Sequence, residues 1–113
     1  MKNRKKIIKL SALIVVHNEE KKLYSCLSKL KLVDEIVVVL DKTNDKSKSI
    51  AKKFTKNIYE GSWELEGERR NFGLNKCNGD WILEIDADEH VTKDLLIEIK
   101  EKIIQAKPGY FLI

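Results

Sequence analysis

Short apolar runs alternate with amphipathic segments along almost the whole chain, and this alternation restricts the possible folds more than any other feature. The run Leu10–Val16 is nearly continuous and rich in β-branched residues, which is typical of a strand buried on both faces. Four further strand-like runs occupy residues 36–40, 57–60, 81–85 and 110–113. Helical apolar spacing occurs in residues 19–31, around residues 50–54, and in residues 68–77 and 92–106. The sequence therefore predicts the order β-α-β-α-β-α-β-α-β.

This order favours an α/β fold with a Rossmann-like, mostly parallel sheet, helices on both faces and right-handed crossovers. Ligands of such open sheets bind beyond the carboxyl ends of the strands, near the point where the strand order reverses. Polar residues follow three of the predicted strands, namely His17, Asn18 and Glu19, then Asp41 and Asp45, then Asp86, Asp88 and Glu89. We therefore expect carboxylates from three strands at one edge of the sheet.

The composition excludes several other classes of protein. The 113 residues are 42% hydrophobic and carry a net charge of +4, which fits one small basic domain with its own core. Cys26 and Cys77 are far apart and in no metal-type spacing, so a disulfide scaffold or a zinc site is not expected. No aromatic residues interleave the lysines as they do in nucleic-acid-binding platforms, so we expect no nucleic-acid partner.

The basic start of the chain, residues 1–6, has two interpretations. It can serve solubility, or it can give weak attraction to phosphates or to an anionic membrane surface. A signal peptide is disfavoured because Lys9 interrupts the apolar run and no small-x-small cleavage site follows. The run is also too short to span a bilayer as a helix. We therefore expect a cytoplasmic protein, with peripheral contact at the inner face of the membrane as an open alternative.

The pair Asp86 and Asp88, directly after a buried-type strand, carries the strongest chemical signal. Two carboxylates separated by one residue can share a divalent cation, with phosphate oxygens and water completing the coordination. Such a cation would act as a Lewis acid and make a diphosphate a better leaving group. The alternative interpretation is an acidic turn before a helix, where Asp is favoured in any case.

Two other groups of polar residues have both a functional and a structural interpretation. Asp41, at the end of its strand, can accept hydrogen bonds from a ribose hydroxyl or a base imide, whereas Asp45 is expected mainly to cap a helix. An arginine of the segment 69–71 can bind phosphate, although a solvated helix face is the simpler interpretation. Packing under a bound base is one of two equally weighted interpretations of His17, and His90 can be a ligand or a surface residue, of which we favour the surface or the edge of the site.

Together these segments resemble the N-terminal half of family-two glycosyltransferases, which have the GT-A fold. The matching segments are SALIVVHNEE (11–20), DEIVVVLD (34–41), NDKS (44–47), ERRNFG (68–73) and NGDWILEIDADE (78–89). They occur in the family's order and cover nearly all of the chain after Lys9. The spacing is similar to the branch that adds sugars to lipopolysaccharide core, which implies a role in cell-envelope polysaccharide synthesis.

The resemblance implies a nucleotide-sugar site, a metal and a reaction. Residues assigned to the donor are Val16, His17, Asn18, Glu19, Asp41, Arg70, Asn71, Asp86 and Ala87. Asp41 would contact the base, usually uracil, and Asp88 with Asp86 would hold Mg²⁺ or Mn²⁺ on the diphosphate. Family members mostly invert the anomeric carbon in one displacement. The implied partners are a nucleotide-sugar donor and a saccharide or lipid-linked acceptor.

The sequence departs from the family pattern in two ways. Leu40 stands where the family commonly has the first of two acidic residues, although Asp41 keeps the second position. The family's general base and acceptor-binding half lie downstream of the metal pair, so no catalytic base is assigned. We expect a basic N-terminal segment, residues 1–9, and a donor-binding domain, residues 10–113, that stops before the acceptor half. A second chain or a C-terminal half would complete the enzyme.

Two alternatives stay open from the sequence. The first is a non-catalytic nucleotide-binding fragment that comes from a truncated or split gene. The second is a phosphohydrolase of the haloacid-dehalogenase type, which also places two aspartates after a buried strand. That motif requires Thr or Val four positions after its nucleophile, whereas His90 stands four positions after Asp86.

Overall fold

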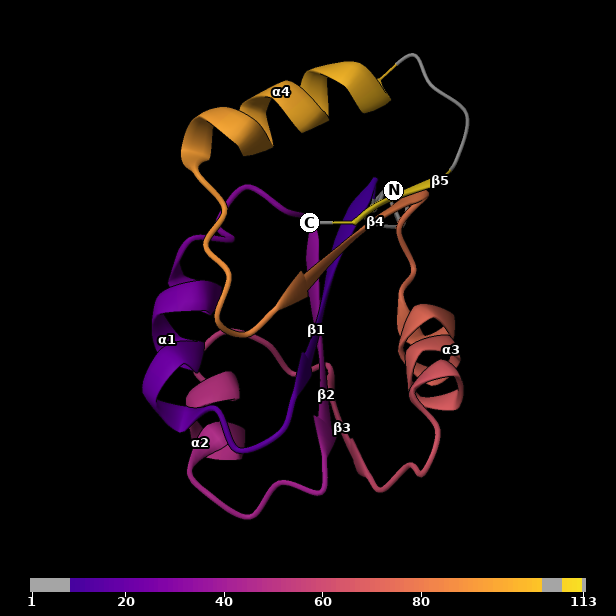
Figure 1. The fold of residues 1–113 in the computed structure, drawn as a ribbon. Coiled ribbons are helices and arrows are strands. Elements are labelled where there is room, and N and C mark those ends of the chain that lie inside the picture. The colour runs from indigo at the N-terminus through magenta and orange to yellow at the C-terminus, as the bar shows by residue number, and fades with distance from the viewer. Residues whose placement is uncertain (1–8, 105–108, 113) are drawn as a thin grey trace, which may run out of the picture.

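Strands and helices alternate along the chain in the order that the sequence predicts (Figure 1). The computed structural model describes residues 9–104 and 109–112. Within these residues the elements are β1 (Leu10–Val16), α1 (Glu20–Ser28), β2 (Glu35–Asp41), α2 (Ser47–Ala51), β3 (Ile58–Gly61), α3 (Glu66–Lys76), β4 (Trp81–Asp86), α4 (Lys93–Ile103) and β5 (Gly109–Leu112). The α/β class is therefore confirmed.

The strands form one parallel sheet in the order β3-β2-β1-β4-β5. β1 is central and pairs with β2 on one side and β4 on the other, with Val16 opposite Leu40 and Val15 opposite Asp86. The carboxyl ends of these three strands therefore meet at one edge. The strand order reverses between β1 and β4, and this is the position at which such sheets bind ligands.

Helices cover both faces of the sheet (Figure 1). α1, α2 and α4 share one apolar cluster with alternate strand residues such as Ile14 and Val38, which are fully buried. α3 covers the other face, where Leu13, Val37 and Val39 are buried. The nearly continuous apolar character of β1 follows from this two-sided burial.

The last crossover differs from our expectation of uniform right-handedness. α4 lies on the same face as α1, but the step from β4 to β5 runs across the sheet in the opposite direction to the step from β1 to β2. These two crossovers therefore have opposite hands. α4 is held over the segment after α1, where Lys100 Nζ donates to the Leu32 carbonyl oxygen at 2.7 Å and pairs with Asp34 at 3.7 Å.

Several element boundaries differ from the predicted ones. α1 is shorter than 19–31, α3 begins at Glu66 rather than 68, and α4 ends at Ile103 rather than 106. α4 begins as predicted, because Thr92 Oγ1 accepts a hydrogen bond from the Leu95 amide at 3.1 Å. The basic residues 1–6, the predicted helix end at 106 and the last residue of the predicted strand 110–113 lie outside the described residues.

A buried polar network joins three segments at the amino-terminal edge of the sheet. Glu35 is 8% exposed and accepts hydrogen bonds from Ser11 Oγ at 2.7 Å and from the Asn78 amide and Nδ2, both at 2.8 Å. The Gly79 amide donates to Ser11 Oγ at 2.8 Å. This network connects the turn before β4 to the starts of β1 and β2. It lies at the amino ends of the strands, whereas the candidate site lies at their carboxyl ends.

No helix in the described part of the chain combines the length and the apolar character needed to cross a bilayer.

Candidate functional site

The polar residues predicted to meet at one edge do meet at the carboxyl ends of β2, β1 and β4. Asp41 ends β2, His17 follows β1 and Asp86 ends β4. Neighbouring strands are about 4.8 Å apart, so β2 and β4 are separated by about 10 Å across β1. The edge therefore presents two groups of carboxylates with the end of β1 between them.

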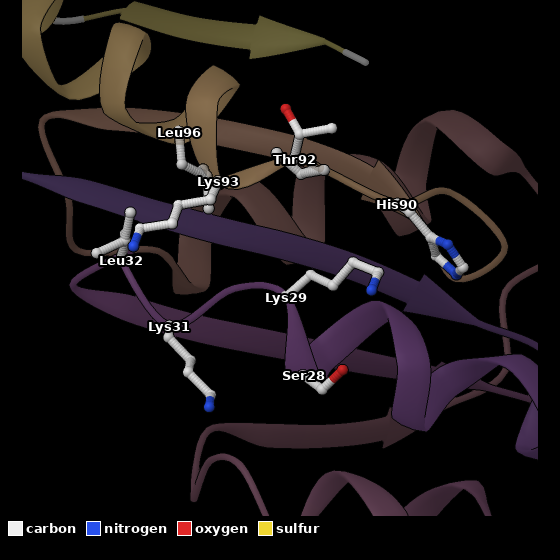
Figure 2. A pocket seen from close by; sticks show the side chains of 9 residues that line it. Ser28, Lys29, Lys31, Leu32, His90, Thr92, Lys93 and Leu96 are labelled. Carbon is white, nitrogen blue, oxygen red and sulfur yellow. The ribbon is translucent and has the colours of Figure 1, made fainter.

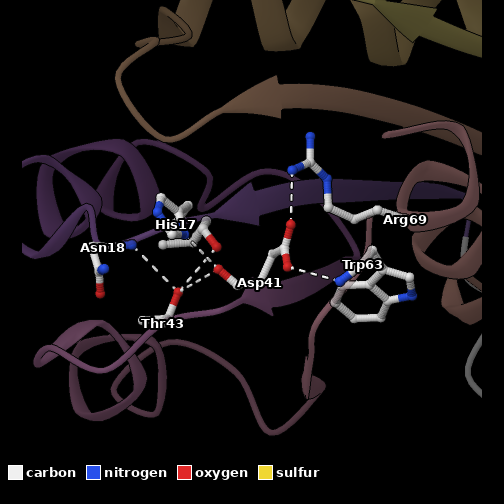
Figure 3. A network of polar contacts seen from close by, with 7 residues as sticks. His17, Asn18, Asp41, Thr43, Trp63 and Arg69 are labelled. Atoms are coloured by element: carbon white, nitrogen blue, oxygen red, sulfur yellow. Dashed lines mark hydrogen bonds and ion pairs between the residues drawn. The ribbon is translucent and has the colours of Figure 1, made fainter. Parts of the chain in front are cut away.

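Hydrogen bonds join the segments that follow β1 and β2 (Figure 3). His17 Nδ1 lies 2.8 Å from the Asp41 carbonyl oxygen. The Thr43 hydroxyl lies 3.2 Å from the Val16 carbonyl oxygen, to which it donates, and 3.3 Å from the Asn18 amide, which donates to it. The Val16 side chain is fully buried, so only its backbone can contribute to the site.

The backbone turns sharply after both strands. Asn18 and Lys42 have φ angles of 50° and 53°, in the left-handed region that residues other than glycine rarely adopt. Asn18 tolerates this region better than most residues, and its Oδ1 accepts a hydrogen bond from the Asn44 amide at 2.9 Å. Lys42 is held there by donating its amide hydrogen to the Gly61 carbonyl oxygen at 2.9 Å.

The Asp41 carboxylate is buried and both of its oxygens are engaged (Figure 3). Oδ1 accepts a hydrogen bond from the Trp63 amide at 3.2 Å, and Oδ2 pairs with Arg69 Nη1 at 2.9 Å. Burial alone would raise the pKa of Asp41, but these hydrogen bonds and the charges of Arg69 and Lys42 outweigh burial and lower it. Asp41 is therefore ionised at neutral pH.

We expect Asp41→Asn to remove part of the pH dependence of stability. A lowered pKa in the folded state gives stability that is present above the ordinary carboxyl pKa and is lost as pH falls through the folded-state pKa. At pH 7 the variant should be less stable by about 1–3 kcal/mol, and the difference should shrink below about pH 4. Urea unfolding across this range measures the effect. Asp80→Asn, at an exposed position, is the control, and a difference for Asp41→Asn that is independent of pH would contradict the prediction.

The two arginines of α3 take different partners. Arg69, which the sequence did not single out over its neighbour, reaches Asp41, and its Nε is buried without a hydrogen-bond partner among the described residues. Arg70, to which the resemblance assigns a nucleotide contact, instead pairs through Nε with Glu84 at 2.9 Å. Asn71 is exposed on the same helix. The nucleotide roles of Arg70 and Asn71 stay predictions.

The loop after β4 exposes two carboxylates around a buried alanine. Asp86 and Asp88 are exposed, whereas Ala87 is 3% exposed and packs into the core. The Asp86 amide donates to Glu89 Oε1 at 2.8 Å, and the Glu89 amide donates to the Asp86 carbonyl oxygen at 3.0 Å. This reciprocal pair of hydrogen bonds holds the loop in shape and leaves both aspartate carboxylates accessible.

The donor set suits a cation that keeps several non-protein ligands. Among the described residues no group of three or more His, Cys, Asp or Glu side chains is arranged to hold a metal ion. Two exposed carboxylates match Mg²⁺, which typically binds one or two carboxylates together with water and substrate phosphates. The arrangement therefore fits an ion that arrives with a phosphorylated ligand.

Two other predicted residues have mainly structural contacts. Asp45 caps both neighbouring helical segments, because its carboxylate accepts from the Ser47 amide at 2.9 Å and from the Glu20 amide at 3.2 Å. The expectation of a capping role for Asp45 is thus confirmed. Glu19 lies half-buried at the start of α1, where its carbonyl oxygen accepts from Leu23.

Sequence reasoning missed Thr43 and the amide of Trp63 as parts of the site. Thr43 bridges the segments after β1 and β2, and the Trp63 amide donates to Asp41. The polar turn after β2 was a usable signal for Thr43. Every residue except proline has a backbone amide, so residue type does not indicate which amide will contact Asp41. The contact of the Trp63 amide could therefore not be predicted from the sequence.

The fold is an open α/β sheet with carboxylates on both sides of the point where the strand order reverses, which is where sheets of this class bind ligands. The sequence profile of the glycosyl transferase family 2 matches residues 11–112, and the chain belongs to this family. The match favours the glycosyltransferase interpretation over the phosphohydrolase alternative.

Curated relatives carry names of the same class. An uncharacterized glycosyltransferase of Rickettsia felis is 33% identical over 93 residues, which are 81% of this chain and 33% of that protein. The lipopolysaccharide core biosynthesis glycosyltransferase LpsC of Rhizobium meliloti is 32% identical over 92 residues, which are 76% of this chain and 34% of that protein. The chain thus spans about a third of the length of these relatives.

Solved structures share the fold. The crystal structure of Staphylococcus aureus TarS residues 1–349 matches with a TM-score of 0.72 and 26% identity, covering 87% of this chain and 33% of that one. Glucosyl-3-phosphoglycerate synthase from Mycobacterium tuberculosis, crystallised with Mn²⁺, UDP-glucose and glycerol 3-phosphate, matches with a TM-score of 0.64 and 20% identity. That match covers 74% of this chain and 36% of the mycobacterial chain.

Proposed function

We propose that the chain is the donor-binding part of a glycosyltransferase that uses a nucleotide-diphosphate sugar, with UDP as the nucleotide. The observation that carries the proposal is the shared edge, where Asp41, the end of β1 and the pair Asp86 and Asp88 lie in that order across the sheet. Family membership supports the same assignment. The base would lie at Asp41 and the diphosphate at the aspartate pair.

Each group of residues would have a distinct task. Asp41, fixed by Arg69 and the Trp63 amide, would present an ionised acceptor toward a base N–H. Asp86 and Asp88 would hold Mg²⁺ or Mn²⁺, which when bound neutralises charge on the diphosphate leaving group. The buried Ala87 and the reciprocal hydrogen bonds of Glu89 would keep the two carboxylates apart and outward.

The proposed reaction is one displacement with inversion. An acceptor hydroxyl would attack the anomeric carbon while the bond from that carbon to the diphosphate oxygen breaks, and the hydroxyl proton would pass to a general base. No described residue is assigned as that base. The name of the relative LpsC supports a saccharide or lipid-linked acceptor of the cell envelope. A C-terminal half or a second chain would supply the acceptor site, and the cell location would be cytoplasmic or peripheral at the inner membrane face.

Titration calorimetry with UDP-glucose, with and without Mn²⁺, tests the proposal, because these are the ligands named for the mycobacterial structure. We expect binding that is tighter with Mn²⁺ by about tenfold or more, since a cation held by Asp86 and Asp88 would offset the repulsion between these carboxylates and the diphosphate. In the presence of Mn²⁺, Asp88→Ala should reduce the affinity for UDP-glucose to the value that the unmodified chain shows without the ion.

Asp80→Ala is the matched control, because Asp80 is an exposed aspartate just before β4, at the opposite end of that strand. It should bind like the unmodified chain. Absence of binding by the folded chain, or binding that is unchanged in Asp88→Ala, would refute the proposed donor site.

A further inference from the structure

A groove of about 640 Å³ lies between the second half of α4 and the residues that lead into β1 and β2, at the amino ends of the strands. The apolar part of its lining consists of Leu32, Ile97, Ile103 and Ile104. Ile103 is buried, but Ile97 and Ile104 are 41% and 76% exposed. The groove therefore presents an apolar surface that no described part of the chain covers.

A row of carboxylates flanks the exposed isoleucines on α4. At about 100° per residue, Asp94, Glu98 and Glu101 fall within about 60° of one another around the helix, beside Ile97 and Ile104. All three carboxylates are exposed, and none forms an ion pair with another described residue. The exposed side of α4 thus combines apolar and acidic groups, which suits an occupant that is both apolar and basic.

The hollow at the other end of α4 has the opposite charge (Figure 2). Lys29, Lys31 and Lys93 line it, and no Asp or Glu is among its lining residues. The three side chains extend away from one another, so they do not converge on one anion, but they do repel basic groups. The charges along α4 therefore direct a basic occupant to the groove at its carboxyl-terminal half.

The basic start of the chain leads directly from this groove. Lys9 lines the groove, and its amide donates to Asp34 Oδ2 at 3.1 Å, which fixes the point from which the preceding residues extend. Residues 1–8, outside the described residues, have the sequence MKNRKKII, with two isoleucines next to Lys9 and four cationic residues before them. Two residues span at most about 7 Å, so every conformation leaves Ile7 and Ile8 within reach of the groove.

We propose that residues 1–8 dock on α4, with Ile7 and Ile8 in the groove and the cationic residues along Glu98 and Glu101. Eight extended residues span about 26 Å, which exceeds the length of about 16 Å for the 11 residues of α4. The apolar contact supplies most of the attraction, because each exposed ion pair contributes little by itself. This inference does not rest on the proposed donor site, which lies at the carboxyl ends of the strands.

Carbodiimide cross-linking of the full chain tests the proposal, because this reagent joins an amine to a carboxylate without a spacer. Mass spectrometry of the monomer fraction should show links from Lys2, Lys5 or Lys6 to Glu98 or Glu101. Their yield should stay the same on tenfold dilution, since the contact lies within one chain. Absence of these links, or links found only in a dimer fraction, would overturn the proposal.

The rate of trypsin cleavage after Lys5 and Lys6 gives a second measurement, because docking should protect these bonds. Glu98→Gln/Glu101→Gln should raise the rate about fivefold, since it increases the undocked fraction that trypsin cleaves. Ile104→Ser should raise the rate by a similar factor through loss of apolar contact. All three side chains are exposed, so we expect these variants to keep the fold, which amide spectra check directly.

Glu64→Gln/Glu68→Gln and Leu65→Ser are the matched controls. They change equally exposed types of residue at the start of α3, which covers the other face of the sheet. Both controls should be cleaved like the unmodified chain. Equal acceleration in the controls and in the α4 variants, or no acceleration in the α4 variants, would contradict docking on α4.

Phosphatidylglycerol vesicles test the other possible occupant of the basic segment. Vesicle binding that is lost in Lys5→Gln/Lys6→Gln, together with absence of cross-links to α4, would overturn the proposal in favour of a membrane contact. UDP-glucose titrations in Mn²⁺ report separately on the donor site and should be unchanged in Glu98→Gln/Glu101→Gln.

Discussion

Glu35→Ala is expected to lower the free energy of unfolding by about 1–3 kcal/mol, measured by urea unfolding at pH 7. The Glu35 carboxylate is buried and accepts three hydrogen bonds, one from Ser11 Oγ and two from Asn78. Removing it leaves the fully buried Ser11 hydroxyl without its acceptor and frees the Asn78 side chain, which is itself exposed, from the start of β2. Because small domains are stable by only about 5–15 kcal/mol, this loss is a large fraction of the total.

Two other variants separate the network from simple loss of a carboxylate. Glu35→Gln keeps an acceptor oxygen and should lose less stability than Glu35→Ala. Glu60→Ala removes an exposed carboxylate that pairs with Lys48 at 2.7 Å, and should cost at most about 1 kcal/mol. A loss below about 1 kcal/mol for Glu35→Ala would mean that the network contributes little to stability.

The sequence predicted which residues lie at the carboxyl ends of the strands, but it did not predict which of their side chains contact one another. Apolar runs give the strands, and parallel strands carry their following residues to one edge, so the placement of Asp41, His17 and Asp86 follows from pattern alone. The partner of Asp41 does not follow. Arg69 and Arg70 point about 100° apart around α3, so only one can reach Asp41, and which one does so depends on how the helix is rotated against the sheet.

The face taken by α4 and the role of Glu35 were also beyond sequence reasoning. α4 is amphipathic, and amphipathic spacing shows that one side is buried but not against which face of the sheet. Its contact with Leu32 depends on the path of the loop after β4. Glu35 reads as a polar residue before an apolar strand, and only its tertiary partners Ser11 and Asn78 reveal that it is buried.

Gly79→Ala is expected to destabilise the fold by about 3 kcal/mol, because the new methyl group would meet backbone atoms that cannot move away. A Cβ at Gly79 would lie 2.7 Å from Ser11 Oγ, 2.8 Å from the Ser11 amide nitrogen and 2.9 Å from the Trp81 carbonyl oxygen. The adjacent strands fix these atoms, since the Trp81 amide donates to the Lys9 carbonyl oxygen at 2.8 Å. Relief of the clash would also break the hydrogen bond from the Gly79 amide to Ser11 Oγ.

Gly67→Ala is the matched control, because a Cβ at Gly67, in the first turn of α3, would meet nothing within 4 Å. It should stabilise the chain by about 0.5–1 kcal/mol through the better helix propensity of alanine. If the two substitutions change the free energy of unfolding in opposite directions, then glycine is required at position 79 because the Ser11 and Trp81 atoms approach it closely, and not because of its backbone freedom. Equal effects would contradict this. Since the turn at Gly79 begins β4, and β4 carries Asp86 to the edge of the sheet, a destabilised Gly79→Ala should also bind UDP-glucose with Mn²⁺ more weakly than Gly67→Ala.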